Sequence, residues 1–391
     1  MNRILFVQYA NPAAYPPLEH SSRIMAEAGD QVLFLGIRAL PTLKFRQHEQ
    51  IRVKLMPECS PGLRQKAHYL LFSLWVFFWT LRWRPQLVYA SDYLSSPIAL
   101  VLSYWPNLKV VYHEHDSPSS ARTSLFQRTC LAARRRLARR VRVNVLPNER
   151  RAELFAAEMG DIENVVCVWN CPSVDEIAPP RNVGRPKDLW VLYHGSITPV
   201  RLPLSVMKAL ALLPANVKLR VIGYETIGHI GYIGQLRSAA RDYGLKNRVQ
   251  FLGAISRYEL LRWCVKSDIG LAFVPRVRDS VNEQNLTGAS NKAFDYLSCG
   301  LALVVSDVPD WRGSYVEPGY ALACDSDDPQ SIANALRWFL DHPEEMRAKG
   351  EMGRQKILSD WNYEGQFQPV LRKISQPGPV FFQAEPDLRN V

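Results

Sequence analysis

Short apolar runs alternate with longer segments of helical period along most of the chain. In the first part, the runs are rich in β-branched and aromatic residues and end in polar or turn residues; they span 3–8, 31–36, 86–90, 109–113 and 142–147. Continuous apolar runs of this length are typical of parallel strands that are buried on both faces. Their alternation with helical segments predicts an α/β fold with a doubly wound sheet, which binds ligands at the carboxyl ends of its strands.

The same pattern restarts after residues 172–187, which are rich in proline and polar residues and are typical of a linker. Further strands are expected at 189–194, 218–223, 248–253, 268–273 and 301–307, and helices at 330–341, 344–359 and 361–374. The sequence therefore predicts two tandem Rossmann-like domains that face each other across a cleft, with boundaries at 1–178 and 179–360. Residues 361–391 are expected to form a last helix and tail that return toward the first domain.

Composition indicates an ordinary globular protein, because 47% of the residues are hydrophobic and 22% are charged. The 7 cysteines are scattered without metal-ligand spacing, which favours reduced thiols in the cytoplasm. The first residues hold an apolar run that is too short for a signal peptide and fits a first strand. Net charge is +11, and residues 122–142 alone hold eight arginines and no acidic residue.

The stretch "NLTGASNKAFDYLSCGLALVVSD" at residues 285–307 suggests an anion site. A small polar loop leads into a helix, and the free N–H groups and the dipole at a helix N-terminus attract anions. Lys292 stands in the first turn of this helix, with Asp295 one turn further on the same face. A lysine and an aspartate at this spacing also occur as an ordinary solvated pair, so the stretch alone leaves both interpretations open.

Four segments in order make the resemblance to a family specific. They are "YHGSITPVR" (193–201), "RVIG" (220–223), residues 248–275 and "SNKAFDYLSCGLALVVSD" (290–307). Together they resemble the donor-binding domain of GT-B fold glycosyltransferases, in the group that includes retaining sucrose- and mannosyl-type enzymes. "VVYHEHD" (110–116) is similar to the N-terminal segment that faces the cleft. The resemblance implies a UDP- or GDP-linked sugar as donor in the second domain and an acceptor in the first.

The resemblance also implies roles for individual residues. The donor's diphosphate needs fixed positive groups and N–H dipoles where charge develops, which requires no metal ion. The residues expected around the diphosphate are Gly195, Ser196, Arg201, Gly288, Ala289, Ser290 and Lys292. The residues expected around the nucleoside are Gly223, Leu252 and Asp295, whose carboxylate could accept hydrogen bonds from two ribose hydroxyls.

The chain departs from the family pattern at two positions. Relatives often carry Glu-x7-Glu, in which the first glutamate contacts the donor sugar; here Thr287 stands at that position and Glu283 is out of register. Many relatives carry a second basic residue after the glycine of the phosphate loop, where this chain has Ser196. These departures leave the sugar contact and the retention of configuration open.

Acceptor-side residues are expected in the first domain. Glu19, His20 and Arg23 lie near the start of the first helix, and His115 and Asp116 follow a strand's carboxyl end. Histidine and carboxylate side chains suit proton transfer or hydroxyl binding, so His115 and Asp116 are the catalytic candidates. The alternative is that they cap the next helix. A zinc site at His113 and His115 is not expected, because no third ligand has suitable spacing.

Two segments bear on membrane contact. Residues 65–85 are intensely apolar from Ala67 to Leu81, which is shorter than the roughly 18–20 residues of a membrane span. They predict either a helix buried in the first domain or a monotopic insertion with flanking Trp and basic residues. Residues 126–142 can form an amphipathic helix with an arginine face, which suits an anionic membrane surface or simply solvent. Nothing resembles a nucleic-acid-binding module.

The sequence thus predicts a glycosyltransferase that moves a sugar from a nucleotide sugar to a hydroxyl of a lipid-linked or polysaccharide acceptor, with retention. It would be cytoplasmic and peripheral at the inner face of a bacterial membrane, contacting anionic lipid through residues 122–142. Two alternatives stay open: a degenerate, non-catalytic assembly partner, and a nucleotide-sugar epimerase on the same fold. The epimerase would need carboxylates around the sugar, and Thr287 argues against it.

Overall fold

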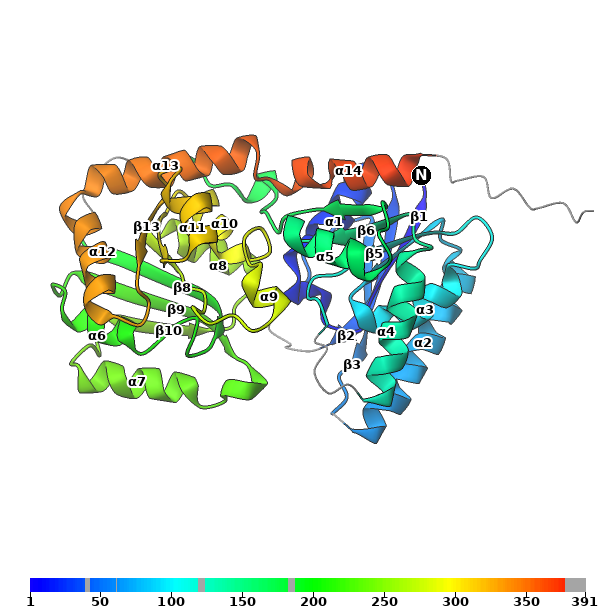
Figure 1. Cartoon of the computed structure of the whole chain (residues 1–391), viewed down its shortest axis with the longest axis horizontal. Coiled ribbons are helices and arrows are strands. Elements are labelled where there is room, and N and C mark those ends of the chain that lie inside the picture. Colours follow the sequence, from blue (N-terminus) through cyan, green and yellow to red (C-terminus); the bar gives the residue numbers. More distant parts are fainter. Residues whose placement is uncertain (39–42, 61, 119–123, 182–186, 377–391) are drawn as a thin grey trace, which may run out of the picture.

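The computed structural model describes residues 1–38, 43–60, 62–118, 124–181 and 187–376, and it forms two α/β domains (Figure 1). Each domain has its own parallel sheet, so the predicted fold class is confirmed. Residues 182–186 of the predicted linker, residues 122–123 of the predicted basic segment and the tail after residue 376 lie outside the described ranges.

The first sheet has seven strands in the order β3-β2-β1-β4-β5-β6-β7. All neighbouring strands run parallel. The order reverses between β1 and β4, and such a switch point is where α/β sheets bind ligands. The strands are β1 (Arg3–Gln8), β2 (Gln31–Arg38), β3 (Ile51–Pro57), β4 (Leu87–Ser91), β5 (Lys109–His113), β6 (Val143–Leu146) and β7 (Val165–Cys167).

Helices cover both faces of the first sheet. One face packs against α1 (Pro16–Glu27) and the last helix of the chain, α14 (Tyr363–Ser375). The other face packs against α2 (Leu63–Trp83), α3 (Ser96–Leu102), α4 (Leu125–Ala138) and α5 (Glu149–Glu158). The strands are therefore buried on both sides, which explains their continuous apolar runs.

The second sheet has six parallel strands in the order β10-β9-β8-β11-β12-β13, and its switch point lies between β8 and β11. The strands are β8 (Leu189–Ile197), β9 (Val217–Glu225), β10 (Val249–Gly253), β11 (Ile269–Ala272), β12 (Ala302–Ser306) and β13 (Ala321–Cys324). The helices are α6 (Ser205–Ala211), α7 (Tyr232–Asp242), α8 (Arg257–Val265), α9 (Val281–Gln284), α10 (Asn291–Ser298), α11 (Pro309–Trp311), α12 (Pro329–Asp341) and α13 (Pro343–Ser359).

The last helix crosses back from the second domain to the first. After α13 and the turn at residues 360–362, α14 lies along the first domain (Figure 1). Tyr363, Phe367 and Val370 are fully buried against α1 and the first sheet. Lys109 at the start of β5 donates from Nζ to the carbonyl of Ile374 at 2.6 Å. The chain therefore passes between the domains twice, once before β8 and once before α14.

The apolar segment at 65–85 forms α2, a surface helix that buries one face against the first sheet. Its buried residues are Tyr69, Phe72, Val76 and Thr80. Its opposite face carries large apolar side chains that are about half exposed, such as Leu74 at 57%. The alternative of a helix buried inside the domain is therefore wrong. No helix within the described ranges is long and apolar enough to cross a membrane.

The arginine-rich segment forms α4, which is amphipathic as predicted. It begins at the capping box of Ser124 and Gln127, and it buries Cys130, Ala133 and Leu137. Arg134 is the exception among its arginines, because it is buried and pairs with Glu114 and Glu158. The remaining arginines of the described part of α4 stay at the surface.

Candidate active site

A cavity of about 420 Å³ lies between the two domains, and we call it the interdomain cleft. Both switch points open into it: the segment after β1 and the end of β5 line one side, and the ends of β8 and β9 with the start of α10 line the other. Among the predicted site residues, those on its wall are His115, Asp116, Gly195, Arg201, Gly223, Ala289, Ser290, Lys292 and Asp295. The topology therefore gathers most of the predicted site in one place.

Lys292 presents a buried amine to this cleft. Its side chain is 7% exposed, and Nζ lies 5.6 Å from the ring centroid of Tyr193. A Cβ at Gly195 would lie 3.1 Å from the Lys292 Cε, so Gly195 leaves room for the lysine stem. Within the described residues Lys292 makes no ion pair. Burial, followed by the nearby charge of Arg201, holds the pKa of Lys292 well below its ordinary value. An anion in the cleft would stabilise the charged form.

The N–H donors for such an anion differ from those predicted. The amides of Ala289 and Ser290 donate to the carbonyl of Leu286 at 3.1 Å and 2.9 Å, so they are already used. Helix α10 starts directly after Ser290, whose side chain makes no capping hydrogen bond. The first N–H groups of α10, at residues 291–293, are therefore the donors that the helix leaves free.

A glycine is needed at residue 288 for packing, which the sequence did not reveal. Its φ is +77°, and a Cβ there would lie 2.7 Å from Cδ1 of Trp169. Its carbonyl accepts from the N–H of Asn170 at 2.7 Å, and Asn170 Nδ2 donates to the carbonyl of Ala289 at 2.7 Å. Gly288 does not line the cleft. It lets this loop pack against the connection between the domains, instead of letting the backbone approach a phosphate.

Gly195 and Gly223 let two strands meet at the cleft. Gly223 has φ +143°, and a Cβ there would lie 1.8 Å from the carbonyl oxygen of Gly195. The two glycines are register partners in β8 and β9. Any side chain at residue 223 would push the ends of these strands apart, so this part of the site depends on a glycine.

Asp295 is held by a buried charge network. Its Oδ1 accepts from Arg257 Nη2 at 2.9 Å, and its Oδ2 lies 3.4 Å from His194 Nε2. Arg257 also donates to both oxygens of Glu176, at 2.5 Å and 2.7 Å. Burial raises the pKa of Asp295, and Arg257 opposes this shift. One oxygen of Asp295 is therefore already engaged by an arginine, and the contact of this carboxylate with the ribose hydroxyls stays a prediction.

Glu176 ties this network to the connection between the domains. It belongs to the short helical turn Val174–Glu176 and lies 3.0 Å from His20 Nε2 of the first domain. Although burial alone would raise the pKa of Glu176, Arg257 and His20 hold it well below its ordinary value. The sequence analysis missed both Arg257 and Glu176, since only the folded chain brings them beside Asp295.

His115 faces the cleft from the first domain with its ring nitrogens free. The residue is 6% exposed, and neither nitrogen has a hydrogen-bond partner among the described residues. Its ring centroid lies 4.0 Å from that of His113 and 5.1 Å from that of Tyr15. Burial and the charge of Arg151 lower the pKa of His115 to about 3. The neutral ring is a weak base that can donate and accept hydrogen bonds to hydroxyl groups.

Other buried polar atoms on the cleft wall also lack protein partners within the described ranges. They are Oδ1 of Asn170 and Oδ1 of Asn291. Buried polar atoms are nearly always hydrogen-bonded, so a group of exceptions around one cavity indicates a polar ligand. No cluster of His, Cys, Asp or Glu suited to a metal ion occurs in the described part of the chain.

Comparison with known proteins is consistent with this geometry. Residues 205–372 match the model of a family described as "Glycosyl transferase-like". Sucrose-phosphate synthase from Thermosynechococcus elongatus superposes with a TM-score of 0.71 at 15% identity, covering 96% of this chain and 99% of that one. HepE of Anabaena, in complex with UDP and glucose, superposes with a TM-score of 0.71 at 16% identity, covering 96% and 100%.

The chain has the GT-B fold, and the match to the glycosyltransferase-like family covers most of its second domain. WaaG, a glycosyltransferase involved in lipopolysaccharide biosynthesis, also shares the fold, with a TM-score of 0.68 at 13% identity over 95% of this chain and 100% of that one. No curated protein matches the sequence. The predicted resemblance is confirmed, and the low identities mean that the solved structures establish the fold alone.

Several predicted site residues lie away from the cleft wall. Ser196 lies in β8, where its carbonyl accepts from the Tyr193 hydroxyl at 2.5 Å. Leu252 packs into the core of the second domain, although its neighbours Ala254 and Ile255 line the cleft. Thr287, the other departure from the family pattern, also has a structural role, because its carbonyl accepts from Asn148 Nδ2 of the first domain at 2.7 Å.

The three predicted acceptor-side residues do not line the cleft either. Helix α1 turns them toward the connection between the domains, where His20 faces Glu176. Arg23 lies 3.0 Å from Asp175, and the Glu19 carboxylate accepts from the N–H of Arg46 at 3.4 Å. Their type suggested sugar binding, but His20 and Arg23 hold the linker against the first domain, and Glu19 binds the backbone of Arg46.

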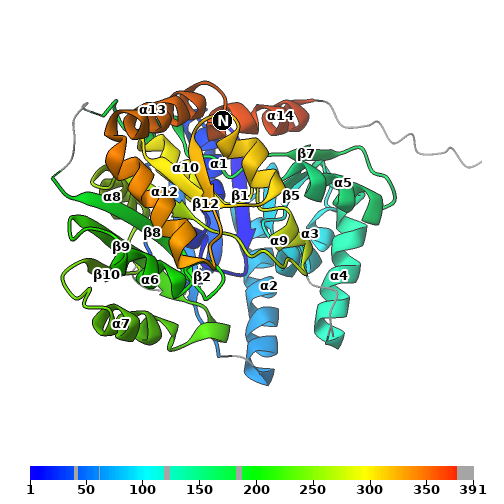
Figure 2. The same cartoon turned by 60° about the vertical axis from the view of Figure 1, so that its left-hand side comes forward.

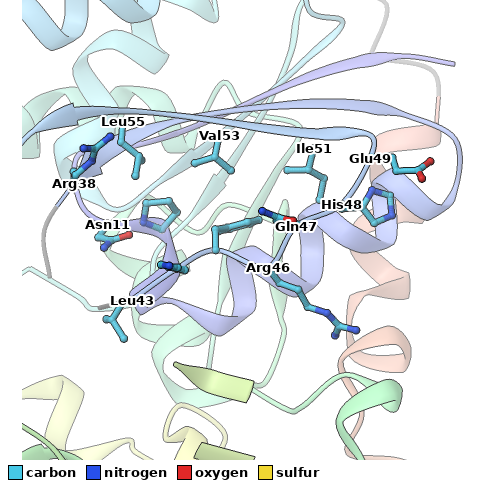
Figure 3. Close-up of a pocket in the computed structure, with 13 residues that line it drawn as sticks. Asn11, Arg38, Leu43, Arg46, Gln47, His48, Glu49, Ile51, Val53 and Leu55 are labelled. Carbon is cyan, nitrogen blue, oxygen red and sulfur yellow. The ribbon is translucent and has the colours of Figure 1, made fainter. Parts of the chain in front are cut away.

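A second and larger hollow lies in the N-terminal domain. It measures about 970 Å³ and adjoins the cleft through Leu43, which lines both. Figure 3 shows Ile51, Val53 and Leu55 projecting from one face of β3 toward residues 43–49. The larger volume does not make this hollow the reaction site, since the free cationic groups and helix N-terminus lie in the cleft. Its polar wall includes Arg38, Lys44, Arg46 and His48.

Proposed function

We propose that this chain is a glycosyltransferase that transfers a sugar from a UDP- or GDP-linked donor to a hydroxyl group of a lipid-linked or polysaccharide acceptor. The observation that carries the proposal is the group of partnerless buried polar atoms around Lys292 and Arg201 in the interdomain cleft. The HepE structures in complex with UDP, with UDP and glucose and with UDP-glucose support a nucleotide diphosphate in the equivalent cleft.

The donor's diphosphate would lie at the N-terminus of α10. As the glycosidic bond breaks, negative charge grows on the leaving diphosphate, and fixed positive groups that face it lower the barrier. Lys292, Arg201 and the first N–H groups of α10 would supply these groups without a metal ion. Closing of the cleft over the bound donor would limit the access of water and therefore the hydrolysis of the donor.

The acceptor would approach from the first domain. His115 and Asp116 are the candidates for orienting its hydroxyl or taking its proton, because both line the cleft opposite Lys292. The low pKa of His115 favours hydrogen bonding to the hydroxyl, which leaves the exposed carboxylate of Asp116 as the better base. Retention of configuration is proposed from the family resemblance.

A glycan or a phosphate-bearing acceptor would extend into the hollow beside β3. That hollow combines basic side chains with an apolar floor, which suits sugar rings and phosphate groups together. The lipopolysaccharide role stated for WaaG supports an acceptor of this kind. A cytoplasmic, peripheral location at the inner membrane face, with the basic face of α4 toward anionic lipid, completes the proposal.

A thermal-shift screen of the purified chain tests the donor site directly. UDP, GDP, CMP and dTDP and their common sugars would be added without metal and then with Mg²⁺. A ligand at about 100 times its Kd stabilises the folded state by about 2.7 kcal/mol, which gives a readily measured rise in Tm. We expect a response to UDP or GDP, and product analysis with candidate acceptors then tests transfer.

The Lys292→Met variant is the matched control for this screen. It should fold and lose most of the nucleotide response. A clear nucleotide response with no transfer to any acceptor would favour the non-catalytic assembly partner. No response to any nucleotide from a folded wild-type chain would overturn the proposed donor site.

A further inference from the structure

Helix α2 is apolar on two opposite faces, although only one of them is buried. Its inner face contributes Phe72 and Val76 to the core of the first domain. The outer face forms a second line of large apolar residues, which we call the outer stripe. Its residues and their exposed fractions are Leu63 81%, Leu70 61%, Leu71 58%, Leu74 57%, Phe78 55% and Leu81 47%. A helix that is apolar all round is normally covered on all sides, so the outer stripe lacks its cover.

The spacing shows that these residues form one continuous surface. They recur every three or four positions from Leu70 to Leu81, which places them within an arc of about 100° along the helix. Scattered exposed apolar residues need no explanation, but a contiguous line along about three turns, from Leu70 to Leu81, does. Such a line in a folded protein indicates contact with another protein or with lipid.

The charge around the outer stripe distinguishes these two partners. Between residues 59 and 113 the only acidic residue is Asp92, which accepts from the N–H of His115 on the cleft side of the domain. Arg64 and Lys66 are exposed beside the start of the stripe, and Arg82 and Arg84 are exposed beside its end. An apolar helix face bordered only by cations is typical of a helix that lies in an anionic membrane interface.

Helix α4 adds further positive charge on the same side of the molecule. Figures 1 and 2 show α2 and α4 extending together beyond the sheets, and the rings of Tyr69 and Phe126 are in edge contact at 4.9 Å. The exposed arginines of α4 are Arg128, Arg135 and Arg136, and Arg139 and Arg140 are exposed directly after its end. Only Arg135 among them lies near a described acidic group, 3.7 Å from Glu158.

We propose that the outer stripe of α2 inserts into the headgroup region of an anionic bilayer, with the arginines of α4 attracting the same surface. The helix would lie in the plane of the membrane. Pairing with a second copy through the stripe is disfavoured, because it would bring the cationic borders of two identical surfaces together. An anionic lipid surface satisfies both the apolar stripe and its charged borders.

This orientation connects the membrane to the reaction site. The start of α2 lies at the carboxyl edge of the first sheet, where the hydroxyl of Tyr9 and Nδ1 of His68 are 2.8 Å apart. The same edge forms one wall of the interdomain cleft. The use of a lipid-linked acceptor at this edge rests on the proposed function, whereas docking of the outer stripe on lipid does not.

Vesicle flotation of the full chain tests the docking surface without any enzyme assay. The vesicles would contain phosphatidylcholine alone, or phosphatidylcholine and phosphatidylglycerol in equal parts. We expect strong binding to the mixed vesicles, weak binding to the neutral ones, and a decrease in binding at high salt. The triple variant Leu70→Gln, Leu74→Gln, Phe78→Gln should bind about tenfold or more weakly.

The matched control variant replaces exposed apolar residues of the second domain: Leu212→Gln, Val265→Gln, Leu358→Gln. It should bind like the wild type. Unchanged Tm and an unchanged nucleotide response in the stripe variant would show that folding and the donor site are intact, which separates this test from that of the proposed function. Equal binding by stripe variant and wild type, or no binding by the wild type, would overturn the inference. A dimer that only the stripe variant loses would assign the stripe to a second copy instead.

Discussion

Replacing Lys292 by methionine separates the function of this residue from its contribution to folding. Methionine keeps most of the apolar stem that packs beside Gly195, and it removes the buried amine. The folded wild type holds the pKa of Lys292 well below its ordinary value because the amine is buried and lies near Arg201. The amine of Lys292 therefore binds its proton more weakly in the folded state than in the unfolded chain.

The sign of the stability change follows from this shift. Between the folded pKa and the unfolded value of about 10.4, the unfolded state binds more protons, so the stability of the wild type rises with pH in that window. The methionine variant has no such dependence. We expect it to be as stable as the wild type or more stable near neutral pH, with the difference disappearing as pH rises through the unfolded value.

Whereas the stability of the variant should be kept or raised, its nucleotide affinity or its turnover should decrease. A hydrogen bond to a charged group contributes about 1.5–3 kcal/mol, which corresponds to roughly ten- to 150-fold in nucleotide affinity or in turnover. If the amine acts mainly on the leaving diphosphate, most of the loss appears in kcat. Lys208→Met is the control, because Lys208 is exposed on α6 and does not line the cleft.

Two measurements are needed: Tm over a range of pH, and release of nucleotide from the donor that the screen selects. A variant with raised or unchanged Tm and reduced turnover would support a diphosphate role for Lys292. A variant that loses stability in proportion to activity would show that Lys292 is structural. Unchanged turnover would remove it from the site.

Three further predictions address the surroundings of the site. Arg257→Leu leaves two buried carboxylates without their shared partner and should cost about 3–5 kcal/mol in urea unfolding, whereas Arg262→Leu on the exposed side of the same helix should cost little. Gly223→Ala should destabilise by more than about 1 kcal/mol and abolish the nucleotide response, because its Cβ would collide with the carbonyl of Gly195. Burial raises the pKa of Asp92 to about 7, so the folded state keeps a proton that the unfolded chain releases near pH 4. The wild type should therefore become less stable as the pH rises from about 4 to 7. Unfolding curves of Asp92→Asn should lack that decrease.

The sequence predicted the interior of both sheets better than their edges. The ten strands expected from apolar runs are all present, and the three that were missed are β3, β7 and β13. Each of these stands at an edge of its sheet. β3 alternates exposed Arg52 and Lys54 with partly buried residues, which breaks the continuous apolar pattern. β7 and β13 are apolar but only 3 and 4 residues long, too short to be recognised as strands.

The donor side of the site shows a similar division between local and distant information. The loop, the helix start and Lys292 lie within one stretch, so a pattern could identify them. The hydrogen bonds of the Ala289 and Ser290 amides depend on a turn at Leu286 that the residue types do not specify. Arg257 lies 38 positions from Asp295, and neither residue signals the other. On the acceptor side, His115 lines the cleft, but Glu19 does not. The residue type alone could not separate the two, because the direction of a side chain on α1 depends on what packs against it.

The return of α14 to the first domain sets an order for folding during synthesis. Domains usually fold as they leave the ribosome, with the N-terminal one first. Here Tyr363, Phe367 and Val370 complete the core of the first domain, and they emerge only after every strand of the second. The nascent first domain must therefore wait with an open apolar face on its sheet, and the domain that begins the chain is the last to be finished.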